Sequence, residues 1–334
     1  MVVNAIKAGV AQVDITPPVG TPLAGNIYPR ISSEVEYPLY VKSLVLSDGG
    51  KSIAIVSLDL LTISRKYVDE ACELIYKETG IPRKYILISA THTHSGPYSI
   101  SVFGGELNQS FMAKLPKQIS SCVKEAYEEL ENAEIGFTST VMSGITHNRR
   151  LLDENGSAWN SWLLSREKRE KLKPAGPTDD ELTILAIRSR NGSLKAIVFN
   201  YASHACVTGT TRKISADYPG AVAKYLSEKL GSDLITLFLP GACGDVNFNY
   251  ELPLDKIAET IGSGILSAIN RVKYTNICKL DAFLKEVTLP IRNLSELQWE
   301  EILLKWSNAI EIFKKEHEKI ILERDEKIKT FALK

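Results

Sequence analysis

Residues 85–97 read Tyr85-Ile-Leu-Ile-Ser-Ala-Thr-His92-Thr-His94-Ser-Gly-Pro97. The apolar run over 85–90 predicts a buried strand, and the Ser-Gly-Pro that ends the stretch predicts a turn. Because side chains two apart share one face of a strand, we expect His92 and His94 to project together from its carboxyl end. That end of a strand is where α/β sheets bind ligands. Two imidazoles on one face form half of a metal site, so hydrolysis with a bound metal is the leading hypothesis.

Similar runs rich in Val, Ile and Leu recur along the chain and alternate with helical patterns. The alternation predicts an α/β fold with a mixed β-sheet core flanked by helices. The expected helices cover 67–79, 114–130, 219 to a stop at Gly231, and 255–269, and the expected strands cover 9–15, 41–47, 52–58, 85–90, 134–140, 182–187, 195–200, 233–238 and 280–289.

Two regions break this alternation. Residues 147–180 are long, polar and charged, and loops of this length are uncommon in compact domains unless they are functional, so we expect a flap beside the site. Ser295 and Gln298 have capping-box spacing and precede apolar residues at helical intervals, which predicts an amphipathic helix over 295–330. We assign residues 1–334 to a single α/β domain that includes both regions.

Composition restricts the classes of function. The 334 residues are 44% hydrophobic, and 40 basic residues balance 40 acidic ones, so no global charge favours nucleic acid as a partner. No apolar run approaches the ~18 residues of a membrane span, and the first residues do not resemble a secretion signal, so we expect a cytoplasmic protein. The five cysteines form no C-x-x-C pair, which argues against a disulfide framework and a thiolate zinc site.

Further candidate site residues follow other apolar runs. His204 comes after the run 195–200 and is a third candidate metal ligand. Asp245, in a glycine-rich loop, and Asp59 are candidates for orienting a ligand histidine, although carboxylates in plain turns would look the same. Arg149 offers a guanidinium group suited to an anion or a developing oxyanion.

Five motifs, in their order along the chain, resemble the catalytic domain of the neutral/alkaline non-lysosomal ceramidase family. The opening residues 8–16 are also similar to the first strand of that domain, and the resemblance extends to about residue 290. The motifs are Thr91-His92-Thr-His94-Ser-Gly-Pro97, Asn148-Arg149, Asn200-Tyr-Ala-Ser-His204, Ser215-Ala-Asp217-Tyr-Pro-Gly220 and Gly241-Ala-Cys-Gly-Asp245-Val246.

The resemblance implies a zinc-dependent amidase that hydrolyses a small-molecule or lipid N-acyl amide. It implies that His92 and His204 bind Zn²⁺ and that His94 and Arg149 contact the scissile amide or its oxyanion. We expect four further residues to support these groups, namely Asp59, Asn148, Asp217 and Asp245.

The resemblance also implies a glutamate and a tyrosine that complete the zinc sphere further downstream in the family domain. The sequence ends at Lys334, about where the strand that precedes them would begin. We therefore expect a truncated family domain that lacks the C-terminal immunoglobulin-like domain of longer members. A homo-oligomer or a second chain would then complete the metal site, or two imidazoles and water would bind the metal weakly.

Two alternatives to an amidase stay open at this level. One is a metal-poor, non-catalytic relative that serves as a binding protein. The other is a different metallohydrolase, an esterase or a phosphatase, in which Asp59 or Asp245 supplies the remaining ligand.

Overall fold

The computed structural model describes residues 5–26, 30–290, 295, 298–304 and 307. Contacts divide the chain into Met1–Phe283 and Leu284–Lys334, where the sequence analysis expected one domain. Each unit is described by itself. Within the second unit, residues 298–304 are helical, and most of the amphipathic helix expected over 295–330 lies outside the described residues.

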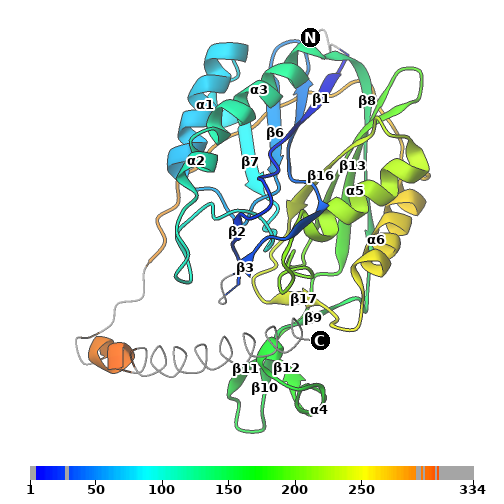
Figure 1. Cartoon of the computed structure of the whole chain (residues 1–334). Helices are drawn as coiled ribbons and strands as arrows, with labels where there is room; N and C mark the ends of the chain where they lie inside the picture. The colour runs from blue at the N-terminus through cyan, green and yellow to red at the C-terminus, as the bar shows by residue number, and fades with distance from the viewer. Residues whose placement is uncertain (1–4, 27–29, 291–294, 296–297, 305–306, 308–334) are drawn as a thin grey trace, which may run out of the picture. The chain divides into compact units, whose positions relative to one another are not determined.

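An eight-stranded mixed sheet forms the core of the first unit, in the order β16-β14-β13-β8-β1-β5-β6-β7 (Figure 1). Eight of the nine expected strands are present; β6 has the expected bounds, and the other seven have shifted ends. Within this sheet, only the pairs β6–β7 and β14–β16 are parallel. The strands are β1 (Lys7–Asp14), β5 (Tyr40–Ser47), β6 (Ser52–Leu58), β7 (Ile86–Ala90), β8 (Glu131–Val141), β13 (Glu181–Ser189), β14 (Leu194–Tyr201) and β16 (Ile235–Pro240).

The sheet bends at the junction of β1 and β8. β1 pairs with β5 along its whole length but with β8 only at Lys7 and Ala8. The two halves of the sheet then face each other across an apolar core that takes Leu44 from one half and Leu237 from the other. A hydrogen bond from Ser57 Oγ on β6 to the carbonyl of Phe238 on β16 also joins the halves.

Helices cover the outer face of each half, so the unit has four layers, helix, sheet, sheet and helix. α1 (Arg65–Thr79) and α3 (Leu115–Glu128) pack on one half, while α5 (Asp217–Leu230) and α6 (Leu254–Ile269) pack on the other. α1 and α5 are the crossovers that parallel pairing requires between β6 and β7 and between β14 and β16.

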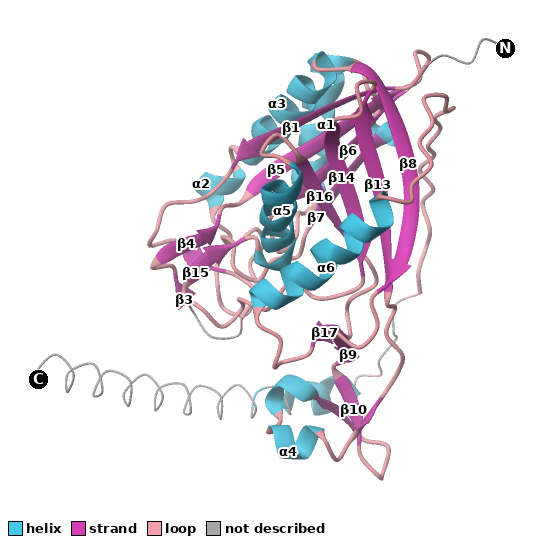
Figure 2. Ribbon diagram, turned by 90° about the vertical axis from the view of Figure 1, so that its right-hand side faces the viewer, coloured by secondary structure: helices cyan, strands magenta, loops and turns pink. Residues whose placement is uncertain are grey.

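The flap expected over 147–180 is a small structure of its own (Figure 2). It contains a three-stranded sheet and the short helix α4 (Arg166–Arg169), and its first strand, β9 (Thr146–Asn148), pairs with β17 (Val246–Phe248). Its other elements are β10 (Arg150–Leu152), β11 (Ala158–Asn160), the 3₁₀ turn η2 (Ser161–Leu163) and β12 (Lys173–Pro174).

The prediction of a strand over 280–289 is wrong. Leu280 is buried and its amide donates to Asp48, but residues 281–290 pair with no strand in the described part of the chain, and Phe283 is 88% exposed. An alternating apolar pattern forms a strand only where a partner supplies the other half of the hydrogen bonds.

Candidate metal centre

The predicted pair of histidines lies in the loop after β7, not on the strand itself. β7 ends at Ala90, and His92 has a left-handed backbone with φ of 66°. Alternation along a strand therefore does not place the two imidazoles, and that part of the sequence argument is wrong. Instead, the His92 amide donates to the carbonyl of Leu60, and the His94 amide donates to that of Ala205 in the loop after β14.

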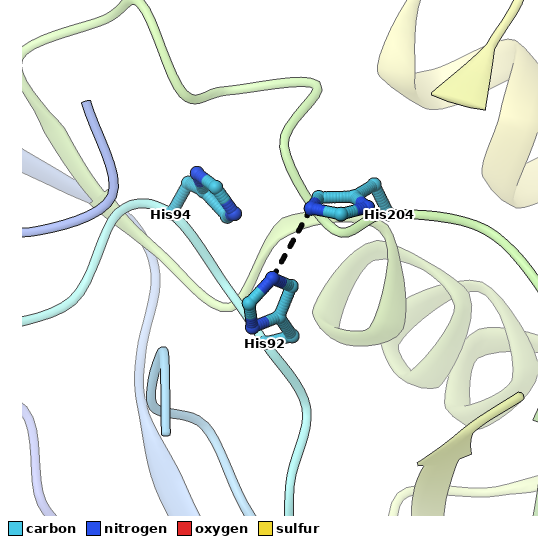
Figure 3. Close-up of side chains that lie close together, drawn as sticks. All are labelled: His92, His94 and His204. Atoms are coloured by element: carbon cyan, nitrogen blue, oxygen red, sulfur yellow. Dashed lines mark hydrogen bonds between the residues drawn. The ribbon is translucent and has the colours of Figure 1, made fainter. Parts of the chain in front are cut away.

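Three histidines nevertheless converge, as expected (Figure 3). The ring centroids of His92 and His94 are 4.9 Å apart, those of His92 and His204 are 4.7 Å apart, and those of His94 and His204 are 5.2 Å apart. His204 follows β14, and its amide donates to the carbonyl of Val246. One ligand atom from each of the three lies within 4.8 Å of the others.

Backbone carbonyls orient all three rings. Nδ1 of His92 lies 2.7 Å from the carbonyl of Leu61, and Nδ1 of His204 lies 2.7 Å from that of Cys243. Nδ1 of His94 contacts the carbonyl of Gly25 at 2.5 Å. Because a carbonyl only accepts, each Nδ1 carries the hydrogen, and each neutral ring has its lone pair on Nε2.

The Nε2 atoms of His92 and His204 face each other at 3.1 Å. With both Nδ1 atoms protonated, two neutral rings place two lone pairs against each other, an arrangement that a cation between them would stabilise. Two nitrogens about 2.0–2.1 Å from a tetrahedral zinc are about 3.3 Å apart, close to this separation. Nε2 of His94 is buried without a hydrogen-bond partner in the described structure. The residues therefore fit a divalent metal.

The neutral state of the rings is the state that ligates metal. Burial lowers the pKa of His94 to about 3, with the nearby His92 as a second cause. Burial also lowers the pKa of His204 to about 4, against the opposing effect of its bond to the Cys243 carbonyl. Both rings are uncharged at neutral pH without metal, so a metal ion would displace no proton from them.

Asp217 connects the two histidine loops. It is fully buried, has a left-handed φ of 57°, and accepts hydrogen bonds from Thr208 N at 2.8 Å and Thr208 Oγ1 at 2.6 Å. Thr208 Oγ1 in turn lies 3.0 Å from Ser95 Oγ in the other loop. The sequence analysis expected a supporting residue here, and the structure shows which segments this carboxylate holds together.

Asn148, Arg149 and Asp245 lie together at the base of the flap. The Arg149 amide donates to the carbonyl of Asp245 at 2.7 Å, and Asn148 Nδ2 donates to Asp245 Oδ2 at 2.9 Å. The positive charge of Arg149 is one of the causes of the lowered pKa of His204, after burial and the nearby His92. Asp245 thus fixes the flap strand, and the expectation that it orients a ligand histidine is wrong because the Cys243 carbonyl does so.

The contacts of Asp59 stabilise the fold. It accepts from the Tyr40 amide at 3.0 Å and lies 3.7 Å from Lys42 Nζ, and burial raises its pKa. Of the described His, Cys, Asp and Glu side chains, only the three histidines form a group able to hold a metal. Neither Asp59 nor Asp245 belongs to that group. This weakens the hypothesis of an esterase or phosphatase in which one of them supplies the remaining metal ligand.

Two residues that position His94 were missed by the sequence analysis. Arg30 is buried and donates to the carbonyl of His94 at 2.5 Å and to that of Ala24 at 2.7 Å. Gly25, with φ of 89°, leaves room for His94, because a Cβ there would lie 2.7 Å from its Cα, Cβ and Cγ atoms. Neither residue stands in a motif, since their roles depend on contacts about 65 residues away in the chain.

Comparisons with known proteins agree with the fold. A family model described as "Neutral/alkaline non-lysosomal ceramidase, N-terminal" matches residues 6–250. The neutral ceramidase from Pseudomonas aeruginosa has a similar structure, with a TM-score of 0.67 at 15% identity over 80% of this chain. A ceramidase complexed with C2 is similar at a TM-score of 0.67, 16% identity and 80% coverage. The chain spans 45% and 44% of the length of those two proteins.

Proposed function

The chain belongs to the neutral/alkaline non-lysosomal ceramidase family, and on that premise we propose that it hydrolyses an N-acyl amide bond with metal-activated water. The observation that carries this proposal is the set of three imidazoles whose ligand nitrogens converge while every Nδ1 is bonded to a backbone carbonyl. Both the fold and the family agree with it.

We propose His92 and His204 as ligands of a divalent metal, with zinc as the preferred ion. Their Nε2 atoms have the separation of adjacent ligands, and imidazole suits zinc. A metal bound there would lower the pKa of a coordinated water and polarise a carbonyl oxygen. The source of the remaining ligands stays a prediction, as does the second chain or homo-oligomer expected to supply them.

His94 is proposed to orient the attacking water. The Nδ1–H tautomer leaves Nε2 as an acceptor, so neutral His94 cannot donate to an oxyanion as the family resemblance implied. A pKa of about 3 also makes its ring a weak base at neutral pH. Accepting a hydrogen bond from water and holding it against the amide carbon is what this ring can do.

Arg149 is proposed to stabilise the oxyanion. It directly follows β9, the flap strand that pairs with β17, and its positive charge is one of the causes of the lowered pKa of His204. A guanidinium group stays protonated and donates hydrogen bonds where negative charge develops. Asn148 and Asp245 hold its backbone, which makes them positioning residues.

The proposed substrate is a lipid or smaller N-acyl amide, cleaved to a carboxylic acid and an amine. The similar ceramidase complexed with C2 supports a lipid amide. Among the described residues, no helix is long and apolar enough to cross a bilayer. A cytoplasmic location stays a prediction.

Release of fatty acid from a short-chain N-acylsphingosine, by the zinc-loaded chain, tests the proposed reaction. Arg149→Ala should lower kcat by roughly 100-fold or more without loss of bound metal, as expected for removal of an oxyanion donor. Arg150→Ala, an exposed neighbour, is the matched control and should leave kcat unchanged. No release of fatty acid by the wild type would reject the proposed reaction. An equal loss of kcat in both variants would reject the role of Arg149.

A further inference from the structure

The flap presents large apolar side chains to solvent. Trp162 and Leu163 on the 3₁₀ turn η2 are 45% and 66% exposed, and Trp159 on β11 is 49% exposed. Isolated exposed apolar residues are common, whereas these three lie within five positions of one another in the sequence. Tryptophan is the residue that membrane-binding proteins favour at the boundary between lipid headgroups and hydrocarbon.

The same segment is strongly basic, although the whole chain has no net charge. Residues 158–174 hold five basic and two acidic residues. Arg166 already pairs with Glu170, and Arg169 lies over the Tyr250 ring. The exposed lysines of the segment have no carboxylate within 4.0 Å in the part of the chain that the structure describes; they are Lys168, Lys171 and Lys173.

The apolar turn has a firm base. Ser161, its first residue, is fully buried; its amide donates to the Arg149 carbonyl at 2.7 Å, and its Oγ lies 2.7 Å from Tyr250 Oη. The side chains of Trp162 and Leu163 are therefore presented outward by a turn that is fixed at its first residue. A preformed anchor of this kind loses little conformational freedom when it enters a membrane interface.

We propose that residues 158–174 of the flap form a docking surface for an anionic lipid bilayer. Trp159, Trp162 and Leu163 enter the interface, while the unpaired lysines contact anionic headgroups. Arg149 leads directly into this flap, so docking would bring the candidate metal centre to the lipid surface. The surface itself does not depend on the proposed hydrolysis, and each can fail without the other.

Sedimentation with vesicles tests the proposal on the full chain. Vesicles of phosphatidylcholine with phosphatidylglycerol should bind the protein, and vesicles of phosphatidylcholine alone should bind it much less. Trp162→Ala/Leu163→Ala and Lys168→Gln/Lys171→Gln should each lower the partition coefficient on the anionic vesicles by roughly 10-fold or more. Added salt should weaken binding of the wild type.

Two control proteins make the result specific. Tyr76→Ala/Leu87→Ala removes an aromatic and a leucine of similar exposure, on α1 and β7, and should bind as the wild type does. Trp299→Ala/Leu303→Ala alters the exposed helix at 298–304. Loss of binding in Trp299→Ala/Leu303→Ala together with full binding in the flap variants would overturn the proposal. A wild type that binds neither kind of vesicle, or binds both equally, would also overturn it.

Discussion

The histidine cluster and the flap, which are joined at Arg149, are held in opposite ways. In the cluster, backbone carbonyls orient each imidazole, and Asp217, itself buried, joins the two loops. In the outer part of the flap, beyond its buried base at Ser161, exposed ion pairs such as Arg166–Glu170 connect residues of α4 and its C-cap. Buried polar contacts are costly to break, whereas exposed pairs contribute little. We therefore expect changes in the cluster to alter stability and metal binding together, and changes to exposed side chains of the flap to alter neither.

The largest effect is expected at Asp217. Asp217→Ala leaves the buried amide and hydroxyl of Thr208 without an acceptor and puts alanine at a positive φ, so the free energy of unfolding should fall by about 3 kcal/mol or more. Asp217→Asn keeps an acceptor and should lose clearly less. Urea unfolding of the metal-free proteins measures both. Equal losses would mean that the carboxylate geometry, and not the lost acceptor, determines stability.

Gly25→Ala should have the next largest effect. The new Cβ would meet His94 at 2.7 Å, and φ of 89° disfavours any side chain. We expect a loss of about 2 kcal/mol in the free energy of unfolding and a marked fall in kcat, because the ring proposed to orient the attacking water, His94, must move. Gly20→Ala, at a φ of 96° with open space around it, is the control for backbone strain alone. If both variants keep the kcat of the wild type, contact with His94 is unimportant.

Acid should destabilise the metal-free protein through the same histidines. An imidazole titrates near 6.5 when exposed, but His204 has its pKa at about 4 and His94 at about 3. Below pH 6.5 the unfolded chain takes up protons that the native state does not, so stability should fall steadily down to about pH 4. His204→Gln should flatten this fall, as seen by urea unfolding across the pH range. If the free energy of unfolding of this variant falls with acid as steeply as that of the wild type, groups other than His204 cause the acid sensitivity.

The smallest effect is expected in the flap. Trp159→Ala removes a half-exposed ring and one hydrogen bond to Asp153, so the free energy of unfolding should change by about 0.5 kcal/mol or less. In thermal unfolding, zinc should raise the midpoint temperature of this variant by as much as it raises that of the wild type. A loss comparable to that of Asp217→Ala would mean that the flap is as integral to the fold as the cluster.

The sequence predicts the layers well because burial imposes a pattern on local residues. Eight apolar runs are strands, and the helices over 65–79 and 217–230 end near their glycines. It also identified the three histidines that converge. It missed Arg30 and Gly25, and it assigned to Asp245 a role that the Cys243 carbonyl has. Every residue has a backbone carbonyl, and contacts between distant loops leave no local pattern. The contacts that orient the histidine rings therefore could not be predicted from the sequence.

The metal content of the purified, dialysed chain tests the central claim most directly. Plasma mass spectrometry should find near-stoichiometric zinc in the wild type and in His147→Ala, whose ring lies in the flap near Ser161. His92→Ala and His204→Ala should each lose the metal while the far-ultraviolet circular dichroism stays that of the wild type. A wild type without metal after zinc loading, or zinc retained by both cluster variants, would contradict the account.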